Sequence, residues 1–137
     1  MPSKKIILLS ILFITLVGGC ATTKVALPPG TLNAAEVTAL FAGKTVESRL
    51  DKSGRISKTY YTPSGETRQL QKGQLRNGTW RVQKNGRICL QFEGDKEKCR
   101  AIIQEGPVYR KYIIKRDGNH LPIITYLSFR SGDQVGR

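Results

Sequence analysis

The segment "TWRVQKNGRICLQFEGDKEKCRAIIQ", residues 79–104, has a clear strand-and-turn pattern. Apolar and polar side chains alternate in three short runs, and the turns "KNG" and "EGDKE" separate these runs. Alternation with a period of two is typical of strands that bury one face, and glycine in a short turn favours a hairpin. The segment therefore predicts three consecutive antiparallel strands.

The same rhythm continues on both sides of this segment. Upstream are "KTVESRL", "RISKTYY" and "ETRQLQ", followed by "KGQLRNG" as a connection; downstream are "VYRKYIIK" and "HLPIITYLSF". About eight short strands at intervals of roughly ten residues, with no recurring helix signal, predict a mainly β fold. We expect a small antiparallel meander that curls into a barrel or a bent sheet, and not a parallel βαβ fold.

One helix precedes the strands, and we expect it over residues 34–42. Asn33 is a good N-cap, Glu36 completes a capping box, and Gly43 suits the position after the helix. The apolar stripe, which includes Val37 and Phe41, predicts packing against the sheet. A membrane-surface helix is the alternative, but the stripe has no lysine or arginine on its flanks.

Cys89 and Cys99 fall on successive predicted strands. A hairpin centred on Gly94 places them opposite each other, which makes a disulfide geometrically reasonable in an oxidising compartment. Free buried thiols are one alternative. A zinc site is another, but two cysteines and the single His120 are too few ligands, and the nearby carboxylates are confined to the turn. We expect no metal and no cofactor.

The N-terminus has the layout of a secretory signal peptide over residues 1–19. Two lysines precede an apolar run of about a dozen residues, which is too short to span a bilayer. The following "VGGC" resembles the lipobox of bacterial lipoproteins, which implies that Cys20 carries a lipid. In Gram-negative lipoproteins, an aspartate after the lipidated cysteine tends to retain the protein at the inner membrane. This chain has Ala21 at that position, so the resemblance implies attachment to the outer membrane, with the domain facing the periplasm. Ordinary secretion with a free or bridged Cys20 is the alternative.

Residues 20–31 contain a proline pair and are expected to form a short tether, followed by a single β domain over residues 32–137. Lysine and arginine total 23 against 10 acids, which gives a net charge of +13. Removal of residues 1–19 takes away two lysines and leaves 21 − 10 = +11. This charge favours an anionic partner, either an envelope polymer or a phospholipid surface. Nucleic acid is an unlikely partner for an anchored envelope protein.

The segment "VYRKYIIKR" contains four cations that are candidate binding residues: Arg110, Lys111, Lys115 and Arg116. We expect Lys111 to lie on the same strand face as Tyr109 and Lys115. The simpler expectation, which also covers Arg100, is that the strand cations lie on the solvated outer face and cover apolar surface with their stems. A packed barrel interior would favour surface binding. An open interior pocket with buried polar groups would indicate a ligand site.

Catalytic motifs are weak. His120 and Asp117 lie together near a turn, but no nucleophile elbow or glycine-rich phosphate loop accompanies them. The acids of "EGDKEK" indicate a solvated hairpin tip. We therefore expect a non-catalytic binding or structural role, with an enzyme or enzyme inhibitor acting on envelope polymers as the alternative.

Several motifs resemble a family of small exported proteobacterial proteins of unknown function. They are "LFAGKT", "YYTPSG" and "NGTWRVQKNGRICLQF", with a second cysteine ten residues beyond the first. The resemblance implies no activity. From the residues themselves, Trp80 is expected to be a core aromatic on a central strand.

Overall fold

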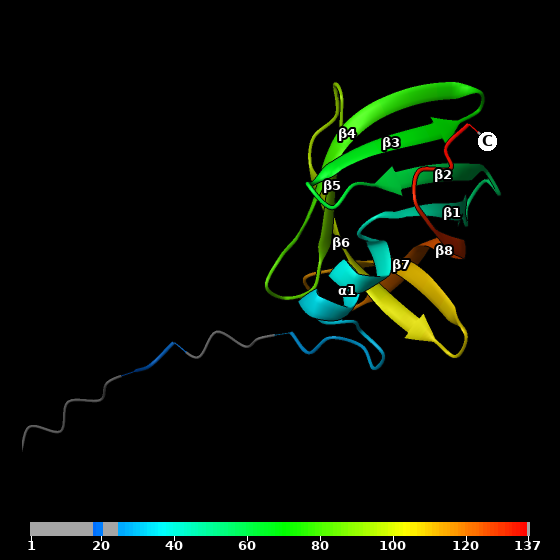
Figure 1. The fold of residues 1–137 in the computed structure, drawn as a ribbon. Helices are drawn as coiled ribbons and strands as arrows, with labels where there is room; N and C mark the ends of the chain where they lie inside the picture. Colours follow the sequence, from blue (N-terminus) through cyan, green and yellow to red (C-terminus); the bar gives the residue numbers. More distant parts are fainter. Residues whose placement is uncertain (1–17, 21–24, 137) are drawn as a thin grey trace, which may run out of the picture.

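Strand β8 (His120–Ser131) pairs antiparallel with strand β1 (Lys44–Leu50), and this pairing closes an eight-stranded barrel. The structure is a computed structural model that describes residues 18–20 and 25–136 (Figure 1). Every strand pairs with the next one along the chain, so the prediction of a mainly β antiparallel meander is confirmed in its barrel form. The intervening strands are β2 (Ile56–Tyr61), β3 (Glu66–Gln71), β4 (Gln74–Val82), β5 (Ile88–Phe92), β6 (Lys98–Glu105) and β7 (Val108–Ile114).

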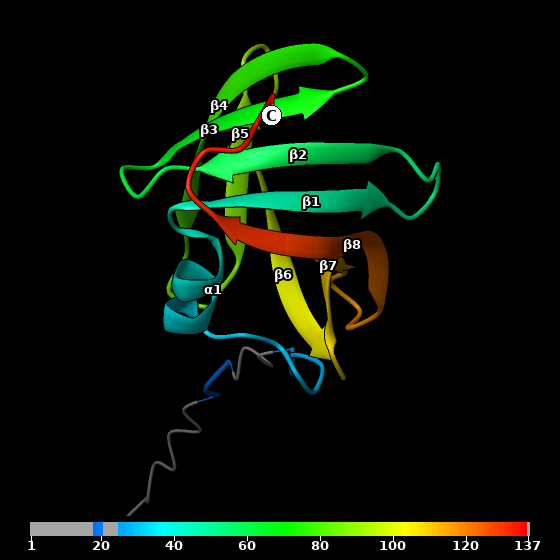
Figure 2. The same cartoon turned by 45° about the vertical axis from the view of Figure 1, so that its right-hand side comes forward.

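The barrel has two different ends. In a closed meander, alternate turns lie at opposite ends, so the β1–β2, β3–β4, β5–β6 and β7–β8 turns share one end, which we call the open end. Helix α1 (Ala34–Phe41) packs at the other end, which we call the plugged end. Figure 2 shows α1 at the opposite end of β1 and β2 from the turn that joins them.

Helix α1 closes its end of the barrel with aromatic packing. The expected capping box is present, since Asn33 and Glu36 exchange hydrogen bonds through their side chains and backbone nitrogens at 2.8 and 2.9 Å. Phe41 is fully buried, and its ring lies edge-on to Tyr61, Tyr126 and Phe129 at centroid distances of 5.0 to 5.5 Å. The helix is therefore a plug, and it ends one residue earlier than predicted.

Strand β4 is longer than the sequence indicated. The expected strand began at Thr79, whereas β4 starts at Gln74 after a two-residue turn of Lys72 and Gly73, both with positive φ. Gly78 is inside this strand and not in a turn. A Cβ on Gly78 would overlap the carbonyl oxygen of Gln91 and lie 2.9 Å from Oγ1 of Thr67, so glycine is required for close strand packing.

The interior divides into an apolar half and a polar half. Near the plug, the core consists mainly of large apolar side chains, and Trp80 is among them as predicted, with its Nε1 donating to the carbonyl of Thr62 at 2.8 Å. Toward the open end, buried positions are occupied instead by polar and charged residues: Ser48, Ser57, Thr59, Gln69 and Lys111. Apolar burial stabilises the plugged half, and the polar half is the place to look for a binding site.

The segment before α1 pairs with the edge of β6 through its backbone. Leu32 donates to the carbonyl of Ile102 at 2.9 Å, and Gln104 donates to that of Gly30 at 2.9 Å, where β5 no longer pairs with β6. The predicted tether therefore joins the barrel from Gly30 onward. Among the described residues, all strand pairing and the aromatic core lie within residues 30–131.

Candidate functional site

A cavity of about 510 Å³ occupies the open half of the barrel. This volume falls within the range of small-molecule sites, which is about 300–1,000 Å³. Its walls combine hydroxyl, amide, aliphatic and aromatic groups with six cationic side chains and one carboxylate, a formal lining charge of 6 − 1 = +5. The charged members are Arg55, Arg76, Asp95, Lys96, Lys98, Arg100 and Lys111.

Lys111 lies in the interior row of the barrel wall. In the pairing register it is opposite Ile102 of β6 on one side and Ile124 of β8 on the other. Ile102 is completely buried, and Lys111 itself is only 8% exposed. An ammonium group therefore lies where the strand pattern otherwise places aliphatic side chains.

No carboxylate neutralises this ammonium group. Among the described residues, Lys111 has no ion pair, and its Nζ lies over the ring of Tyr126, 6.0 Å from the ring centroid. Burial, together with the nearby positive charge of Arg100, lowers the pKa of Lys111 to about 8. A buried cation without a counterion is costly, and an anion bound beside it would remove that cost.

Hydrogen-bonding groups line the wall opposite Lys111. The hydroxyls of Ser48 and Ser57 are 3.0 Å apart, and Nε2 of Gln69 donates to the Thr59 hydroxyl at 3.0 Å. Nε of Arg76, near the mouth, donates to Oε1 of Gln69 at 2.7 Å. These side chains hold one another in place and keep this wall polar.

The phenol oxygen of Tyr126 is buried and has no hydrogen-bond partner. Tyr126 lines the cavity, and burial raises its pKa well above the ordinary value, so the phenol keeps its proton and remains a donor. A buried polar atom without a partner costs free energy comparable to a lost hydrogen bond. Tyr126 therefore contributes to the cavity wall, while its phenol oxygen is covered by neighbouring atoms, and Lys111 is the buried cation of the lining that has no carboxylate partner.

The four candidate cations do not form one site. Arg110 is on the outer face, where its guanidinium pairs with Asp51 at 3.1 Å and Glu105 at 3.4 Å. Lys115 and Arg116 are exposed in the β7–β8 turn. Only Lys111 reaches the interior, and the predicted shared face of Lys111 and Lys115 is wrong because β7 ends at Ile114.

Arg100 and Lys111 correct the expectation that strand cations face outward. Arg100 is opposite the core residue Ile88 in the register of β5 and β6 and lines the cavity. The sequence contains a pattern from which the interior position of Lys111 could have been predicted. The two-residue turn after Glu105 pairs that residue with Val108, and the same register brings Lys111 opposite the apolar Ile102.

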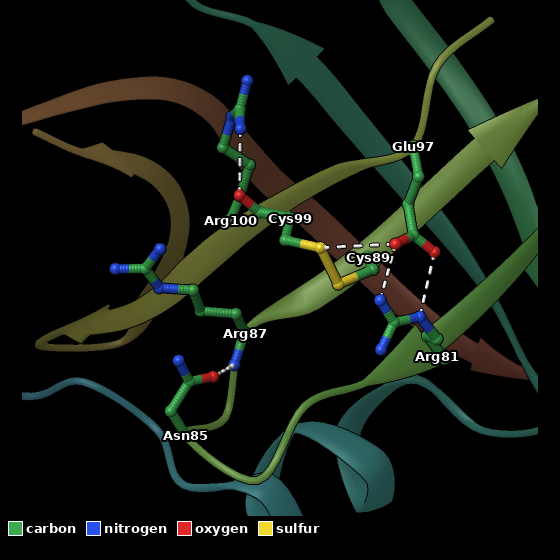
Figure 3. The surroundings of a disulfide bond; sticks show 7 residues. All are labelled: Arg81, Asn85, Arg87, Cys89, Glu97, Cys99 and Arg100. Atoms are coloured by element: carbon green, nitrogen blue, oxygen red, sulfur yellow. Dashed lines mark hydrogen bonds and ion pairs between the residues drawn. A yellow bond between two sulfur atoms is a disulfide. The ribbon is translucent and has the colours of Figure 1, made fainter.

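Cys89 and Cys99 form the predicted disulfide on the outer face, directly opposite each other in β5 and β6 (Figure 3). Beside it, Glu97 accepts two hydrogen bonds from Arg81, at 2.6 and 2.9 Å. In the described part of the chain, the only group that could hold a metal ion is Cys89, Glu97 and Cys99. The disulfide removes both thiolates from that group, so we assign this cluster a structural role.

His120 is exposed at the start of β8, where its ring contacts that of Tyr112 at a centroid distance of 5.5 Å. Asp117 accepts hydrogen bonds from the backbone and side chain of Asn119. Neither residue lines the cavity. No helix among the described residues is long and apolar enough to cross a membrane.

Comparison with known protein families matches residues 10–105 to the family described as "Protein of unknown function (DUF995)". The chain belongs to this family. The match contains the helix, β1 through β6 and both bridged cysteines, so it covers most of the barrel. The resemblance to an uncharacterised family is thereby confirmed. No curated protein and no solved structure gives a significant match.

Proposed function

We propose that the protein is a lipid-anchored binding protein of the bacterial cell envelope, and that it binds the anionic group of a ligand inside the barrel without catalysing a reaction. Lys111 is the observation that carries this proposal. It places a buried ammonium group, with no carboxylate partner, in the wall of a cavity whose lining charge is +5.

The interior groups fit an acidic ligand. Lys111 and Arg100 supply positive charge, and the Ser48 and Ser57 hydroxyls of the lining supply hydrogen-bonding groups. The aliphatic and aromatic part of the wall, which includes Leu90 and Ile124, fits an apolar portion of the same molecule. Asp95 is the only carboxylate of the lining, and the lining holds no histidine or cysteine, so it offers neither a carboxylate pair nor a thiol nucleophile.

The envelope location rests on the N-terminal sequence. The lipobox-like "VGGC" supports lipid attachment at Cys20, which is exposed and is not part of a disulfide. Most of the predicted signal peptide lies outside the described residues. The Cys89–Cys99 disulfide fits an oxidising compartment such as the periplasm.

Calorimetry with residues 21–137 tests the binding function. The probes are decanoate, decanol and inorganic phosphate, at a pH near 7. We expect one decanoate per barrel, with decanol at least about tenfold weaker because it cannot use the Lys111 charge. Lys111→Met should abolish the preference for the acid, whereas Lys84→Met, a charge-matched change in the exposed β4–β5 turn outside the cavity lining, should retain it.

Two results would refute the binding function. One is equal affinity of the unmodified barrel for decanoate and decanol. The other is an unchanged preference for the acid in Lys111→Met. Attachment of lipid to Cys20 is tested separately by metabolic labelling with a radioactive fatty acid, which should label the natural chain and not Cys20→Ala.

A further inference from the structure

Three neighbouring hairpins at the open end share a composition of exposed aliphatic and cationic side chains. Each has an exposed aliphatic side chain at the first or second position of its second strand, and the exposed fractions are 43% for Ile56, 52% for Leu75 and 48% for Leu121. Each also carries exposed cations in its turn. We call this set the basic rim, and it comprises Lys52, Ile56, Lys72, Leu75, Lys115, Arg116 and Leu121.

The charged side chains of the basic rim are all cationic. The turns that carry its four exposed cations contain two carboxylates, Asp51 and Asp117. Asp51 is already engaged by Arg110 and by the Thr125 hydroxyl, and Asp117 by Asn119. The cations therefore remain available to an anionic surface, and aliphatic side chains beside cations are the composition that lies at a lipid interface.

The fourth hairpin at the open end differs. The β5–β6 turn carries Glu93, Asp95 and Glu97 against Lys96, and none of the exposed large apolar side chains is located there. Its acids would be repelled by an anionic surface. The contrast limits the basic rim to the side of the cavity mouth formed by β7–β8, β1–β2 and β3–β4, which are consecutive around the barrel.

The N-terminal segment reaches the same side of the mouth. The Cβ position of Gly118, in the β7–β8 turn, is 3.5 Å from Cγ1 of Val25. Val25 is five residues from Cys20, and five extended residues span at most about 18 Å. A lipid on Cys20 would hold Lys115 and Arg116 close to the membrane that contains it.

From these observations we propose that the basic rim docks on an anionic bilayer, so that the mouth of the cavity faces the lipid and the acidic ligand enters from the membrane. This proposal rests on the proposed function, since it uses both the anchor at Cys20 and the anion site at Lys111. The docked surface is formed by the barrel itself, and its affinity for lipid can be measured without the anchor.

The test uses residues 21–137 and vesicles of phosphatidylcholine with about 30% phosphatidylglycerol, with pure phosphatidylcholine vesicles as the uncharged comparison. We expect binding to the charged vesicles alone, and loss of that binding at high salt. The double variant Lys115→Gln, Arg116→Gln should lower the affinity roughly fivefold for each cation removed. The charge-matched variant Lys84→Gln, Arg130→Gln, at the plugged end, should retain it.

Bilayer contact is tested with tryptophan probes and brominated lipid. The Leu121→Trp probe should be quenched, whereas Val108→Trp, at a position exposed by 36% in the β6–β7 hairpin at the plugged end, should not. Equal quenching of the two probes would overturn the proposal. Equal loss of vesicle binding in the two double variants would overturn it as well. So would rim-dependent binding to a soluble acidic polysaccharide without quenching of the Leu121→Trp probe on vesicles.

The docking proposal and the interior-site proposal can be refuted independently of each other. Lys111→Met should dock on charged vesicles like the unmodified barrel, and Lys115→Gln, Arg116→Gln should bind decanoate like the unmodified barrel. Loss of decanoate binding in the rim variant would contradict the docking proposal. Absence of decanoate binding in every form would refute the interior site, and the vesicle results would still decide the docking.

Discussion

Lys111 of β7 lies directly opposite Ile102 of β6 in the barrel register, and both side chains are buried. A lysine beside an isoleucine in an interior row destabilises an empty barrel, because the ammonium loses water and gains no carboxylate. The ammonium is thus an unsatisfied group in the cavity wall that an acidic ligand could satisfy, and this cost is the basis for assigning the interior a binding role.

Replacing Lys111 with methionine should stabilise the empty barrel at a pH near 7. The substitution keeps most of the side-chain volume and removes the buried charge, and we expect the free energy of unfolding to rise by about 1–3 kcal/mol. Urea denaturation measures the difference. A destabilised Lys111→Met would mean that the ammonium has a stabilising partner in the folded protein.

The stability gap between the two proteins should depend on pH. The pKa of Lys111 is about 8 in the folded protein and 10.5 when unperturbed. Between these values the unfolded chain binds more protons, so the stability of the natural barrel rises relative to Lys111→Met as the pH increases from about 8. Denaturation in steps up to a pH of about 10, where unfolded tyrosines begin to titrate, should show the gap narrowing. A constant gap would contradict the lowered pKa.

The Cys89–Cys99 disulfide should stabilise the fold without affecting the interior site. The bridge closes a loop with a sequence separation of 10, for which the chain-entropy estimate is roughly 2–3 kcal/mol. We expect Cys89→Ser, Cys99→Ser to lose about that much stability and to bind decanoate normally once folded. Cys20→Ser is the control and should unfold like the natural chain under non-reducing conditions.

Phe41 should be the residue of α1 on which barrel stability depends most. It is fully buried against three aromatic rings, and Phe41→Ala should cost about 3–5 kcal/mol. Leu40, one position earlier and only partly buried, is the comparison, and Leu40→Ala should cost clearly less. Thermal unfolding of both variants measures the difference. Equal losses would contradict the description of α1 as a plug anchored by Phe41.

Gly78 should be intolerant of any side chain. A Cβ there would overlap the backbone of β5, and we expect Gly78→Ala to destabilise the barrel by about 1–3 kcal/mol. Asn77→Ala, at an exposed position of the same strand, should change stability by less than about 0.5 kcal/mol. The two variants are compared by urea denaturation. A neutral Gly78→Ala would mean that β4 and β5 can separate at little cost.

Most of the fold could be predicted because its determinants are local. Alternation and turn glycines predict the strands, and the spacing of Cys89 and Cys99 about Gly94 predicts their bridge. The start of β4 was missed because Asn77 and Gly78 have the composition of a turn, while the need for glycine arises from the neighbouring β5 backbone. A contact between strands of that kind leaves no trace in a local pattern.

The site was harder to predict for a physical reason. Alternation separates a strand into two faces but does not say which face is inside, and cations are ordinarily assigned to the outer one. Lys111 and Arg100 violate that rule, and a register shift between Lys111 and Tyr112 further disrupts the simple alternation along β7. The cavity itself depends on closure of the barrel by β1 and β8, which are separated by most of the domain.

A nuclear magnetic resonance titration of the Lys111 side chain will show whether this residue is a buried cation that binds an acid. In the free barrel, the Lys111 ammonium should titrate with a pKa of about 8. Saturation with decanoate should raise that pKa above its value in the free barrel, because the bound carboxylate favours the charged form, whereas decanol should not. An ordinary lysine pKa in the free barrel that decanoate leaves unchanged would contradict the account.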